Sequence, residues 1–372
     1  MAAHLALREM NPKARVRVLH VIDSLDLGGA QTALLNLLRA TDRQRYEPEI
    51  ACMHGRGVFW EEFASLGIPL HSLSPRKWLP LYIPGLIALI RSRRFAIVHC
   101  HLFGANWIAK PLAALVGVPV RISHDQCNDA LRHESRFAFW MDRFTNRFAS
   151  HICAVSATTR DFLIERERIS PDRVSLVYNG VDLGRFTPGS APPARDRFVV
   201  LGVGRLHPQK NFTLFLQVAE LVCREHPTVE FRIAGTGLEE AMLRAQAAAL
   251  GIRDRVVFLG HVADVRGLYA DADVLLMTSR YEGTPLSALE AMAMRLPIVA
   301  PRLDGLAEIL EHETDALLVE PASTSGYSAA LARLVRDSDF RARLAAAAER
   351  KVRRFRFEAI IFSWLPRIQP GV

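Results

Sequence analysis

The chain has 372 residues, of which 50% are hydrophobic and 23% are charged, a composition that excludes fibrous and disordered proteins. This length predicts two domains, because single hydrophobic cores rarely grow beyond roughly 250 residues. The net charge of +8 lies mostly in residues 1–190, which hold 24 Lys and Arg against 17 Asp and Glu. Such a basic half attracts anionic partners, namely phosphorylated substrates, nucleic acid or anionic lipid, although a solvated face that aids solubility explains it equally well.

Cysteine spacing and hydropathy predict the compartment. The five cysteines are widely spaced and form no C-x-x-C pair, so we expect reduced thiols rather than a zinc site or a catalytic nucleophile. The first 19 residues lack the apolar core of a signal peptide. No uninterrupted apolar run reaches the ~18 residues of a membrane span. A cytoplasmic protein is therefore expected.

Strand and helix signals alternate along the first half. A β-branched run over 16–22 predicts a buried parallel strand, and a glycine turn over 25–29 follows it. Apolar residues at helical spacing then predict a helix over 31–40, so the chain opens with a βαβ unit. Further strands are predicted at 95–100, 119–123 and 151–155, with a helix over 105–115.

A proline-rich segment over 183–197 predicts a linker, after which the alternation starts again. We therefore expect an α/β protein with two Rossmann-like, doubly wound domains, in which ligands bind at the carboxyl ends of the strands. The predicted boundaries are 1–188, 189–350 and a C-terminal helical segment 351–372 that returns to the first domain, with the tail helix covering 347–364. Elements of the second half are predicted at 198–203, 213–223, 229–234, 239–250, 256–259, 274–278, 287–294 and 298–300.

Two glutamates eight residues apart, Glu282 and Glu290, mark the segment 281–291. Glu290 can accept hydrogen bonds from ribose hydroxyls, as an acidic residue does in other nucleotide-binding folds. Glu282 can accept hydrogen bonds from the hydroxyls of a sugar. Two surface glutamates beside a helix are the alternative, but the whole segment after a predicted strand favours a binding site.

The helix between these glutamates is predicted to begin near Thr284, with Pro285 in its first turn, where a missing N–H costs nothing. The free backbone amides of Leu286 and Ser287 would then point out of the helix start. These amides and the helix dipole suit an anionic diphosphate.

A second turn, over 202–211, follows a strand and precedes a helix. Gly204 lets the backbone turn tightly, and Arg205 and Lys210 lie beside the turn, where a pyrophosphate needs cations. The pattern is neither G-x-G-x-x-G nor a P-loop, so by itself it is compatible with an ordinary solvated loop.

Two further sites are indicated in the first half. Gly28 and Gly29 precede a helix and permit close approach of a ligand, although a tight structural turn explains them equally well. His99 and His101 lie near a strand end, but no third ligand has a convincing spacing, so no metal site is predicted. His124, beside Asp125 at the end of the next strand, is the better candidate for a sugar contact.

Together these motifs resemble those of the family 4 glycosyltransferases of the group 1 type, which are retaining enzymes of the GT-B fold. The resemblance covers about 15–360, and the matching residues are Gly28-Gly29, Asn179-Gly180-Val181-Asp182, Gly204-Arg205, Lys210-Asn211, Ala234-Gly235-Thr236-Gly237 and the pair Glu282 and Glu290. It implies a first domain on the acceptor side and a second that binds a UDP- or GDP-sugar. Gln31 departs from the family, where many members have glutamate after the two glycines and alanine.

The resemblance also implies a role for each predicted residue. Arg205 and Lys210 would bind the donor diphosphate, Glu282 and His124 would contact the donor sugar, and Glu290 would hold the ribose. Val262 and its neighbour would line the base site, and the loop of Gly28 and Gly29 would approach the phosphates and the acceptor. The family implies no metal or other cofactor. It also implies a glycan or lipid-linked acceptor, as used in envelope or exopolysaccharide synthesis.

The basic residues of the first half also indicate a membrane as a partner. Arg76, Lys77, Trp78, Leu79, Tyr82 and Ile83, followed by Arg91, Arg93 and Arg94, form a basic and apolar stretch that could rest on an anionic membrane. We therefore expect peripheral contact with the inner face of the plasma membrane. No nucleic-acid recognition motif appears. The rival functions are a catalytically silent nucleotide-sugar-binding protein on the same scaffold and a nucleotide-dependent oxidoreductase, whose glycine pattern is absent.

Overall fold

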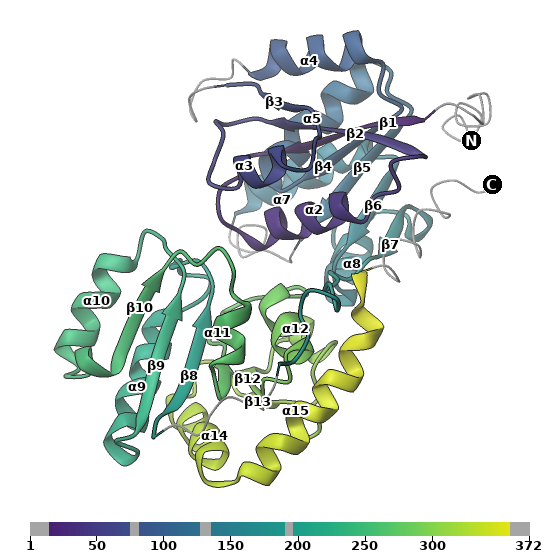
Figure 1. The fold of residues 1–372 in the computed structure, drawn as a ribbon. Helices are drawn as coiled ribbons and strands as arrows, with labels where there is room; N and C mark the ends of the chain where they lie inside the picture. Colours follow the sequence, from purple (N-terminus) through teal and green to yellow (C-terminus); the bar gives the residue numbers. More distant parts are fainter. Residues whose placement is uncertain (1–14, 75–81, 127–134, 190–195, 358–372) are drawn as a thin grey trace. The chain divides into compact units, whose positions relative to one another are not determined.

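The computed structural model describes residues 15–74, 82–126, 135–189 and 196–357. The described chain divides into two compact units (Figure 1). Unit 1 contains the described residues up to Asn179 together with Phe357, and unit 2 is Gly180–Arg356. Both units are parallel α/β sheets covered by helices, as the alternation of strand and helix signals predicts.

Unit 1 is built on a seven-stranded parallel sheet with the order β3-β2-β1-β4-β5-β6-β7. Its strands are β1 (Val16–Ile22), β2 (Tyr46–Cys52), β3 (Leu70–Ser72), β4 (Ile97–His101), β5 (Val120–Asp125), β6 (His151–Ala154) and β7 (Val174–Leu176). Its helices are α2 (Gly29–Arg39), α3 (Trp60–Ala64), α4 (Tyr82–Arg93), α5 (Phe103–Leu115), α7 (Arg136–Thr145) and α8 (Ala157–Glu165).

The two faces of the unit 1 sheet are covered by different helices. Leu19 and Cys100 point to the face covered by α4 and α5, where they join one apolar cluster. Ile22 and Cys52 point to the other face, where Leu35 of α2 and residues around α3 cover them. Strands buried on both faces read as nearly continuous apolar runs, which explains why β1 could be predicted from sequence.

Unit 2 repeats the architecture with a six-stranded parallel sheet in the order β10-β9-β8-β11-β12-β13. Its strands are β8 (Phe198–Val203), β9 (Val229–Ala234), β10 (Val256–Gly260), β11 (Val274–Leu276), β12 (Ile298–Pro301) and β13 (Leu317–Val319). Its helices are α9 (Phe212–Glu225), α10 (Glu240–Ala249), α11 (Arg266–Ala270), α12 (Leu286–Ala293), α13 (Asp304–Ala307), α14 (Thr324–Arg336) and α15 (Ser338–Val352). One large apolar cluster packs α9, α10 and α14 against the sheet.

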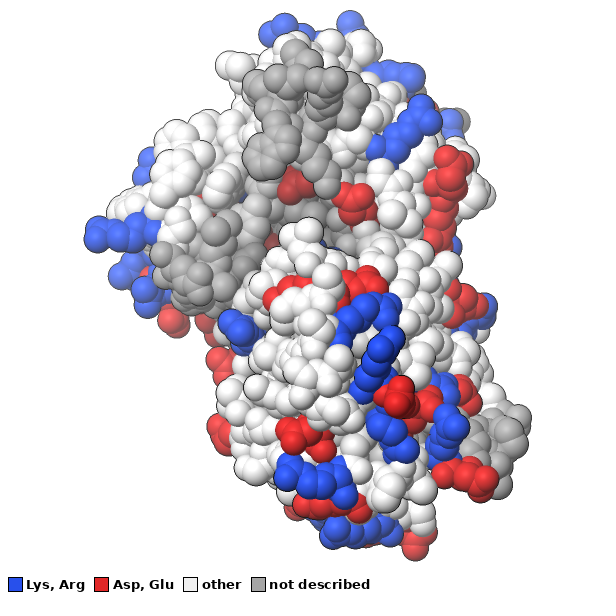
Figure 2. All heavy atoms as spheres, turned by 90° about the vertical axis from the view of Figure 1, so that its left-hand side faces the viewer, with Lys and Arg blue, Asp and Glu red and all other residues white. Residues whose placement is uncertain are grey.

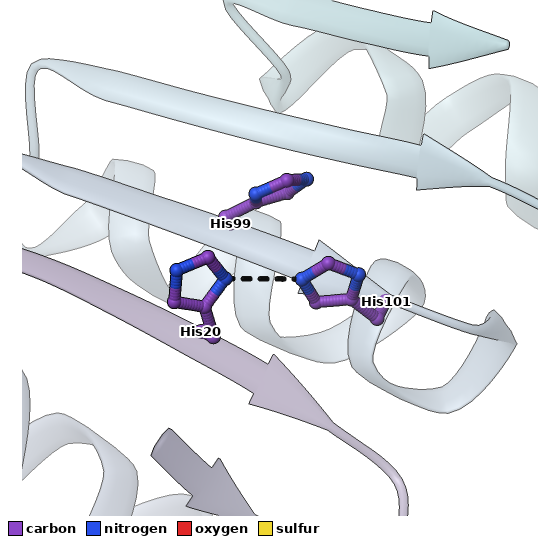
Figure 3. Close-up of side chains that lie close together, drawn as sticks. All are labelled: His20, His99 and His101. Atoms are coloured by element: carbon purple, nitrogen blue, oxygen red, sulfur yellow. Dashed lines mark hydrogen bonds between the residues drawn. The ribbon is translucent and has the colours of Figure 1, made fainter. Parts of the chain in front are cut away.

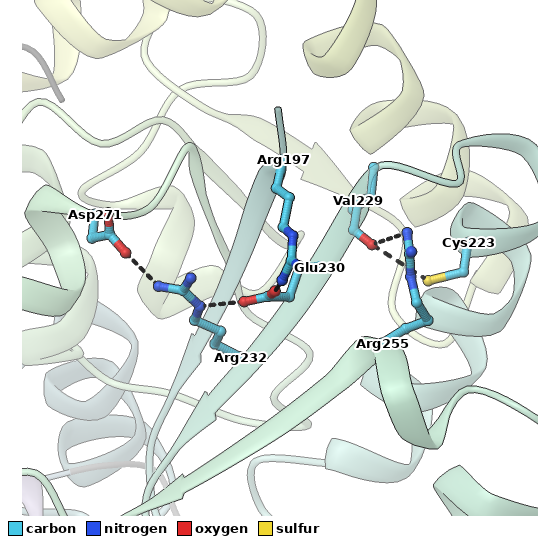
Figure 4. A network of polar contacts seen from close by, with 7 residues as sticks. All are labelled: Arg197, Cys223, Val229, Glu230, Arg232, Arg255 and Asp271. Carbon is cyan, nitrogen blue, oxygen red and sulfur yellow. Dashed lines mark hydrogen bonds and ion pairs between the residues drawn. The ribbon is translucent and has the colours of Figure 1, made fainter. Parts of the chain in front are cut away.

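A charged network connects β9 of unit 2 to the residues just before β8 and just after α11 (Figure 4). Glu230 accepts hydrogen bonds from Arg197, at 2.6 Å, and from Arg232, also at 2.6 Å. Arg232 also pairs with Asp271, which follows α11. Each carboxylate of this network is paired with a guanidinium. The network lies near the amino-terminal end of β9, away from the carboxyl ends of the strands where ligands bind.

The domain boundary and the tail differ from the prediction. Residues 180–188 belong to unit 2, because the backbone N–H of Val181 donates to the carbonyl of Phe355 at 2.9 Å and Phe186 packs against Tyr269. The predicted tail helix over 347–364 is wrong within the described residues, since α15 ends at Val352 and a 3₁₀ turn, Arg353–Phe355, follows it. The other predicted strands and helices are present, with ends that agree to within two residues.

The cysteines that the structure describes agree with the prediction of reduced thiols. Cys52, Cys100 and Cys153 are buried and form no disulfide, while Cys223 is half-buried. Burial raises the pKa of Cys52 to about 11 and that of Cys100 to about 12. Because the thiolate is the nucleophile, these buried thiols are poor candidates for catalysis.

Candidate functional site

The loops that follow β8 and β11 are neighbours in unit 2. From β8 the chain moves outward to β9 and β10, and it then returns to β11 on the other side of β8. This reversal is a topological switch point, the place where open α/β sheets bind ligands beyond the carboxyl ends of their strands. The predicted donor residues Lys210 and Glu282 lie on these two loops.

Lys210 and Glu282 form an ion pair at this switch point. Lys210 Nζ donates to Glu282 Oε1 at 2.5 Å, and Ser279 Oγ donates to the same oxygen at 2.7 Å. The two charged side chains are only 18% and 6% exposed, so the pair is largely shielded from water. Both ends are therefore positioned before any ligand arrives, as a preorganised electrostatic site requires.

Hydrogen bonds from side chains to backbone carbonyls fix the two loops to each other. Thr278 Oγ1 donates to the carbonyl oxygens of Lys210, at 3.0 Å, and of Asn211, at 3.1 Å. Gln209 Nε2 donates to the carbonyl of Tyr281 at 3.2 Å. These cross-links make the position of Lys210 depend on the segment that carries Glu282.

Two glycines permit close backbone approach at the same site. A Cβ atom on Gly235 would lie 1.9 Å from the carbonyl oxygen of Gly204, and Gly235 also has a φ of +148°. A Cβ atom on Gly305 would lie 2.4 Å from the carbonyl oxygen of Glu282. Side chains at either position would displace a loop of the site.

Glu290 lies on α12 and is 8% exposed. Its Oε2 accepts a hydrogen bond from Tyr269 Oη at 2.8 Å. Burial raises the pKa of Glu290 to about 6, although the Tyr269 hydrogen bond and the Arg185 charge both act in the opposite direction. A carboxylate held in this way can accept further hydrogen bonds from hydroxyl groups, as the predicted ribose contact requires.

The start of α12 lies two residues later than predicted. Pro285 is not in the first turn: it has an extended ψ of 127°, and its carbonyl accepts the N–H of Ala288 at 3.2 Å. The helix begins at Leu286, so Leu286 and Ser287 supply the first backbone amides. Amides in these positions have no acceptor within a helix and are open to an anion. Thr284, just before them, is buried.

The other predicted donor residues lie around this centre. Arg205 is exposed on the turn after β8. Gly204 lies against the Lys210 side chain, since a Cβ atom there would be 3.2 Å from Lys210 Cε. Val262 follows β10 and is half-buried.

In unit 1, four histidines gather on β1, β4 and β5. His20 faces His99, and His101 faces His124, in the register of adjacent strands. His20 Nδ1 and His101 Nε2 are 3.2 Å apart and share a hydrogen bond (Figure 3). Burial lowers the pKa of His20 to about 3 and that of His124 to about 4, so these imidazoles are neutral at neutral pH.

Three of these histidines could hold a metal ion. The ligand nitrogens of His20, His99 and His101 lie within 4.8 Å of one another, so β1 provides the third imidazole that spacing along the sequence did not reveal. Two observations favour a neutral hydrogen-bonded cluster instead. His20 and His101 already bond to each other, and the positive charge of Arg43 acts on His20 and disfavours a cation there.

The predicted glycine loop of unit 1 is held by Gln31. This side chain is 6% exposed, and its Nε2 donates to the carbonyl of Ser24 at 3.0 Å. A Cβ atom on Gly28 would lie 2.4 Å from Gln31 Oε1, whereas one on Gly29 would meet nothing within 4 Å. The Gln31 side chain therefore fills the space beside Gly28, whereas the space beside Gly29 is empty of protein atoms and could admit a ligand.

Sequence reasoning missed several residues of these sites. Tyr269 lies on a five-residue helix, and the sequence gives no sign that its hydroxyl reaches Glu290. Ser279 follows β11 and is three residues before Glu282, a signal that could have been used. His20 stands within an apolar run on a predicted strand, so its position facing His99 follows only from strand order.

The chain matches two families of known proteins. Residues 27–185 match the family described as Glycosyltransferase Family 4, and residues 187–351 match the family described as Glycosyl transferases group 1. A D-inositol 3-phosphate glycosyltransferase of Frankia alni is 32% identical over 280 residues, which are 68% of this chain and 69% of the relative. The two family matches meet near the boundary between the two units.

Another relative and a solved structure are also similar to this chain over most of its length. The Escherichia coli UDP-Gal:alpha-D-GlcNAc-diphosphoundecaprenol alpha-1,3-galactosyltransferase is 26% identical over 268 residues, covering 68% of this chain and 69% of the relative. The crystal structure of HepE of Anabaena in complex with UDP-glucose covers 93% of this chain and 97% of its own, with a TM-score of 0.81 and 22% identity. This likeness identifies the fold as GT-B.

Proposed function

Because this chain belongs to the family 4 glycosyltransferases of the group 1 type, we propose that it moves a sugar from a nucleoside diphosphate to a hydroxyl of a glycan or lipid-linked acceptor. The observation that carries the proposal is the ion pair of Lys210 and Glu282 at the switch point of unit 2. A cation and a sugar-binding carboxylate are there within one hydrogen bond of each other.

Transfer breaks the bond between the anomeric carbon and the diphosphate, and negative charge grows on the leaving phosphate. Lys210, Arg205 and the amides of Leu286 and Ser287 are the groups of this unit suited to that charge. Preorganised donors of this kind can each contribute about 3–4 kcal/mol to transition-state stabilisation. Since these groups can take the place of a metal ion, we propose a metal-independent reaction. By analogy with the family, we also propose that it retains the anomeric configuration without a covalent intermediate.

The donor and acceptor classes are supported by the relatives. The name of the Escherichia coli relative specifies UDP-galactose and an acceptor linked to diphosphoundecaprenol, and HepE was solved with UDP-glucose. We propose a UDP- or GDP-sugar as the donor and an acceptor of envelope or exopolysaccharide synthesis. Within the described part of the chain, no helix has the length and hydropathy to cross a bilayer. A lipid-linked acceptor would be met by a protein on the cytoplasmic face of the membrane, in peripheral contact with it.

A donor screen tests the proposal. The purified chain is incubated with UDP- and GDP-sugars and a panel of glycan and lipid-linked acceptors, with EDTA present in a parallel series. Release of nucleoside diphosphate with a glycosylated product whose anomeric configuration matches that of the donor is the expected result, unchanged by EDTA. Binding of UDP or GDP without product from any acceptor would favour the silent sugar-nucleotide-binding protein instead.

A further inference from the structure

Helix α7 of unit 1 turns aromatic side chains to the solvent. Phe137, Trp140 and Phe144 are 71%, 56% and 52% exposed, and the other Phe, Trp and Tyr side chains that the structure describes are buried or half-buried. Their spacing of three and four residues places them on one face of the helix. The opposite face carries the buried residues Ala138 and Thr145, so the helix is amphipathic with its aromatic side outward.

Arginines flank this aromatic face. Arg136 is the first residue of α7, Arg147 lies in the 3₁₀ turn that follows the helix, and both are exposed. The Arg143 guanidinium lies 5.2 Å from the ring centre of Trp140. The single acidic residue of the helix, Asp142, is buried and accepts a hydrogen bond from Trp107 Nε1 at 3.2 Å. The outward face therefore combines aromatic rings with arginines and presents no carboxylate of its own.

This combination is unusual on the described surface. The other exposed large apolar residues of the described chain all lie outside α7; they are Val58, Leu115, Leu238, Met242 and Val257. Over unit 2, the face shown in Figure 2 has basic and acidic side chains next to one another, so their charges largely balance. Contiguous exposed apolar groups bordered by charge mark a binding surface in a soluble protein, whereas single exposed residues need no explanation.

The described part of the stretch 76–94, which the sequence predicted to contact a membrane, is less suited to that role than α7. Residues 75–81 lie outside the described residues. On α4, Tyr82, Leu86 and Ile90 are buried in the core of unit 1. The helix therefore offers basic residues at its end, such as Arg91, without exposed large apolar residues beside them.

We propose that α7 is the surface by which the chain lies on an anionic phospholipid bilayer. The aromatic rings would enter the boundary between headgroups and acyl chains, and the flanking arginines would pair with lipid phosphates. The absence of an outward carboxylate on the helix favours a negative surface over a mixed one. This inference specifies the membrane contact within the proposed function, but it does not depend on the donor chemistry.

The test is sedimentation of the full chain with vesicles of phosphatidylcholine alone or with about a third of phosphatidylglycerol, at low and high salt. We expect binding only to the anionic vesicles, and weaker binding at high salt. Replacing Phe137, Trp140 and Phe144 together by serine should lower partitioning at least about tenfold, because each ring buries apolar surface. Replacing Arg136, Arg143 and Arg147 by glutamine should lower it about fivefold per arginine.

The matched control is the double variant Leu238→Ser and Met242→Ser, which removes exposed apolar residues from unit 2 and should leave binding unchanged. Circular dichroism checks that each variant is folded. The proposal is overturned if the wild-type chain ignores anionic vesicles, or if the serine variant binds them as well as the wild type. It is also overturned if that variant changes only the association of the chain with itself. Binding to vesicles without any sugar transfer would contradict the proposed function and leave this inference standing.

Discussion

Lys210 Nζ lies 2.5 Å from Glu282 Oε1, although the two residues are 72 positions apart in the chain. The pair joins the loops after β8 and β11 and is shielded by Ser279 and the surrounding backbone. A donor diphosphate that enters this site would meet a cation already held in place by a carboxylate. The pair thus links the predicted phosphate contact to the predicted sugar contact.

Lys210→Ala should therefore remove transition-state stabilisation rather than only donor binding. We expect kcat to fall by about 10²–10³, because one preorganised donor aimed at the leaving phosphate is lost. Lys210→Arg keeps the charge but not the shape of the ammonium group, so it should recover part of the rate. The measurement is steady-state kinetics with the donor found by the screen.

The control for this prediction is Arg302→Ala, which removes an exposed ion pair with Glu320 elsewhere in unit 2. Exposed pairs of this kind contribute roughly 0–1 kcal/mol, so stability and rate should both stay near the wild-type values. Wild-type kcat in Lys210→Ala would show that this lysine does not act on the leaving group.

Glu290 predicts a pH dependence of donor binding. Burial raises its pKa to about 6, so the carboxylate takes up a proton as the pH falls through 6 and loses acceptors for ribose hydroxyls. The donor KM should accordingly rise below about pH 6. Tyr269 stabilises the charged form through its hydrogen bond, so Tyr269→Phe should move this rise to higher pH. The measurement is the donor KM between pH 5 and 8.

Tyr327→Phe is the matched control for Tyr269→Phe, because Tyr327 is buried in the same unit and its hydroxyl has no hydrogen-bond partner among the described residues. It should leave the pH profile in place. A profile that is identical in wild type and Tyr269→Phe would exclude Glu290 as the titrating group.

Local patterns were enough to predict β1 and the helix between Glu282 and Ala293 but not β2. The apolar run of β1 and the spacing of Glu282 and Glu290 depend on neighbours along the chain. In contrast, β2 has the sequence YEPEIAC, in which a proline and two glutamates argue against a central strand. Its Glu49 is buried because His71, at 2.7 Å, and Arg17, at 3.5 Å, approach it from other elements.

The same reason explains what was missed in the sites. Tyr269 and Glu290 meet through packing of α11 against α12, and His20 meets His101 through strand order. Neither contact leaves a periodic signal in the sequence. Residue types and spacing could therefore nominate candidate ligand contacts such as Glu290, but not the residues that orient them, such as Tyr269.

Gln31 offers a test of the glycine loop in unit 1. Gln31→Glu keeps the shape but cannot donate to the Ser24 carbonyl, and it places a carboxylate where the side chain is 6% exposed. We expect the free energy of unfolding to fall by about 1–3 kcal/mol. The tryptophans that the structure describes, Trp60, Trp107 and Trp140, all lie in unit 1, so tryptophan fluorescence during urea unfolding reports on this unit.

Gln44→Glu is the control, because it makes the same change at an exposed position and should alter stability by less than about 0.5 kcal/mol. Equal effects of the two substitutions would mean that the hydrogen bond to Ser24 does not hold the loop.

The histidine cluster of unit 1 should make this unit sensitive to acid. In the folded chain the pKa of His20 is about 3 and that of His124 about 4, because burial disfavours the imidazolium form. Arg43 lowers the pKa of His20 further, whereas Asp125 partly offsets the shift of His124. In the unfolded chain both groups titrate near pH 6.5.

Between pH 6.5 and 4 the unfolded chain therefore binds more protons than the folded chain, and stability falls as the pH falls. Each histidine should account for about 2 kcal/mol of this loss between pH 7 and 5. His124→Gln removes one titrating group, so the pH dependence of urea unfolding, followed by tryptophan fluorescence, should become less steep. His71→Gln is the matched control in the same unit, because His71 is half-buried and lies on β3, outside the histidine cluster. A profile equally steep in wild type and His124→Gln would mean that this imidazole is already protonated or hydrated in the folded chain.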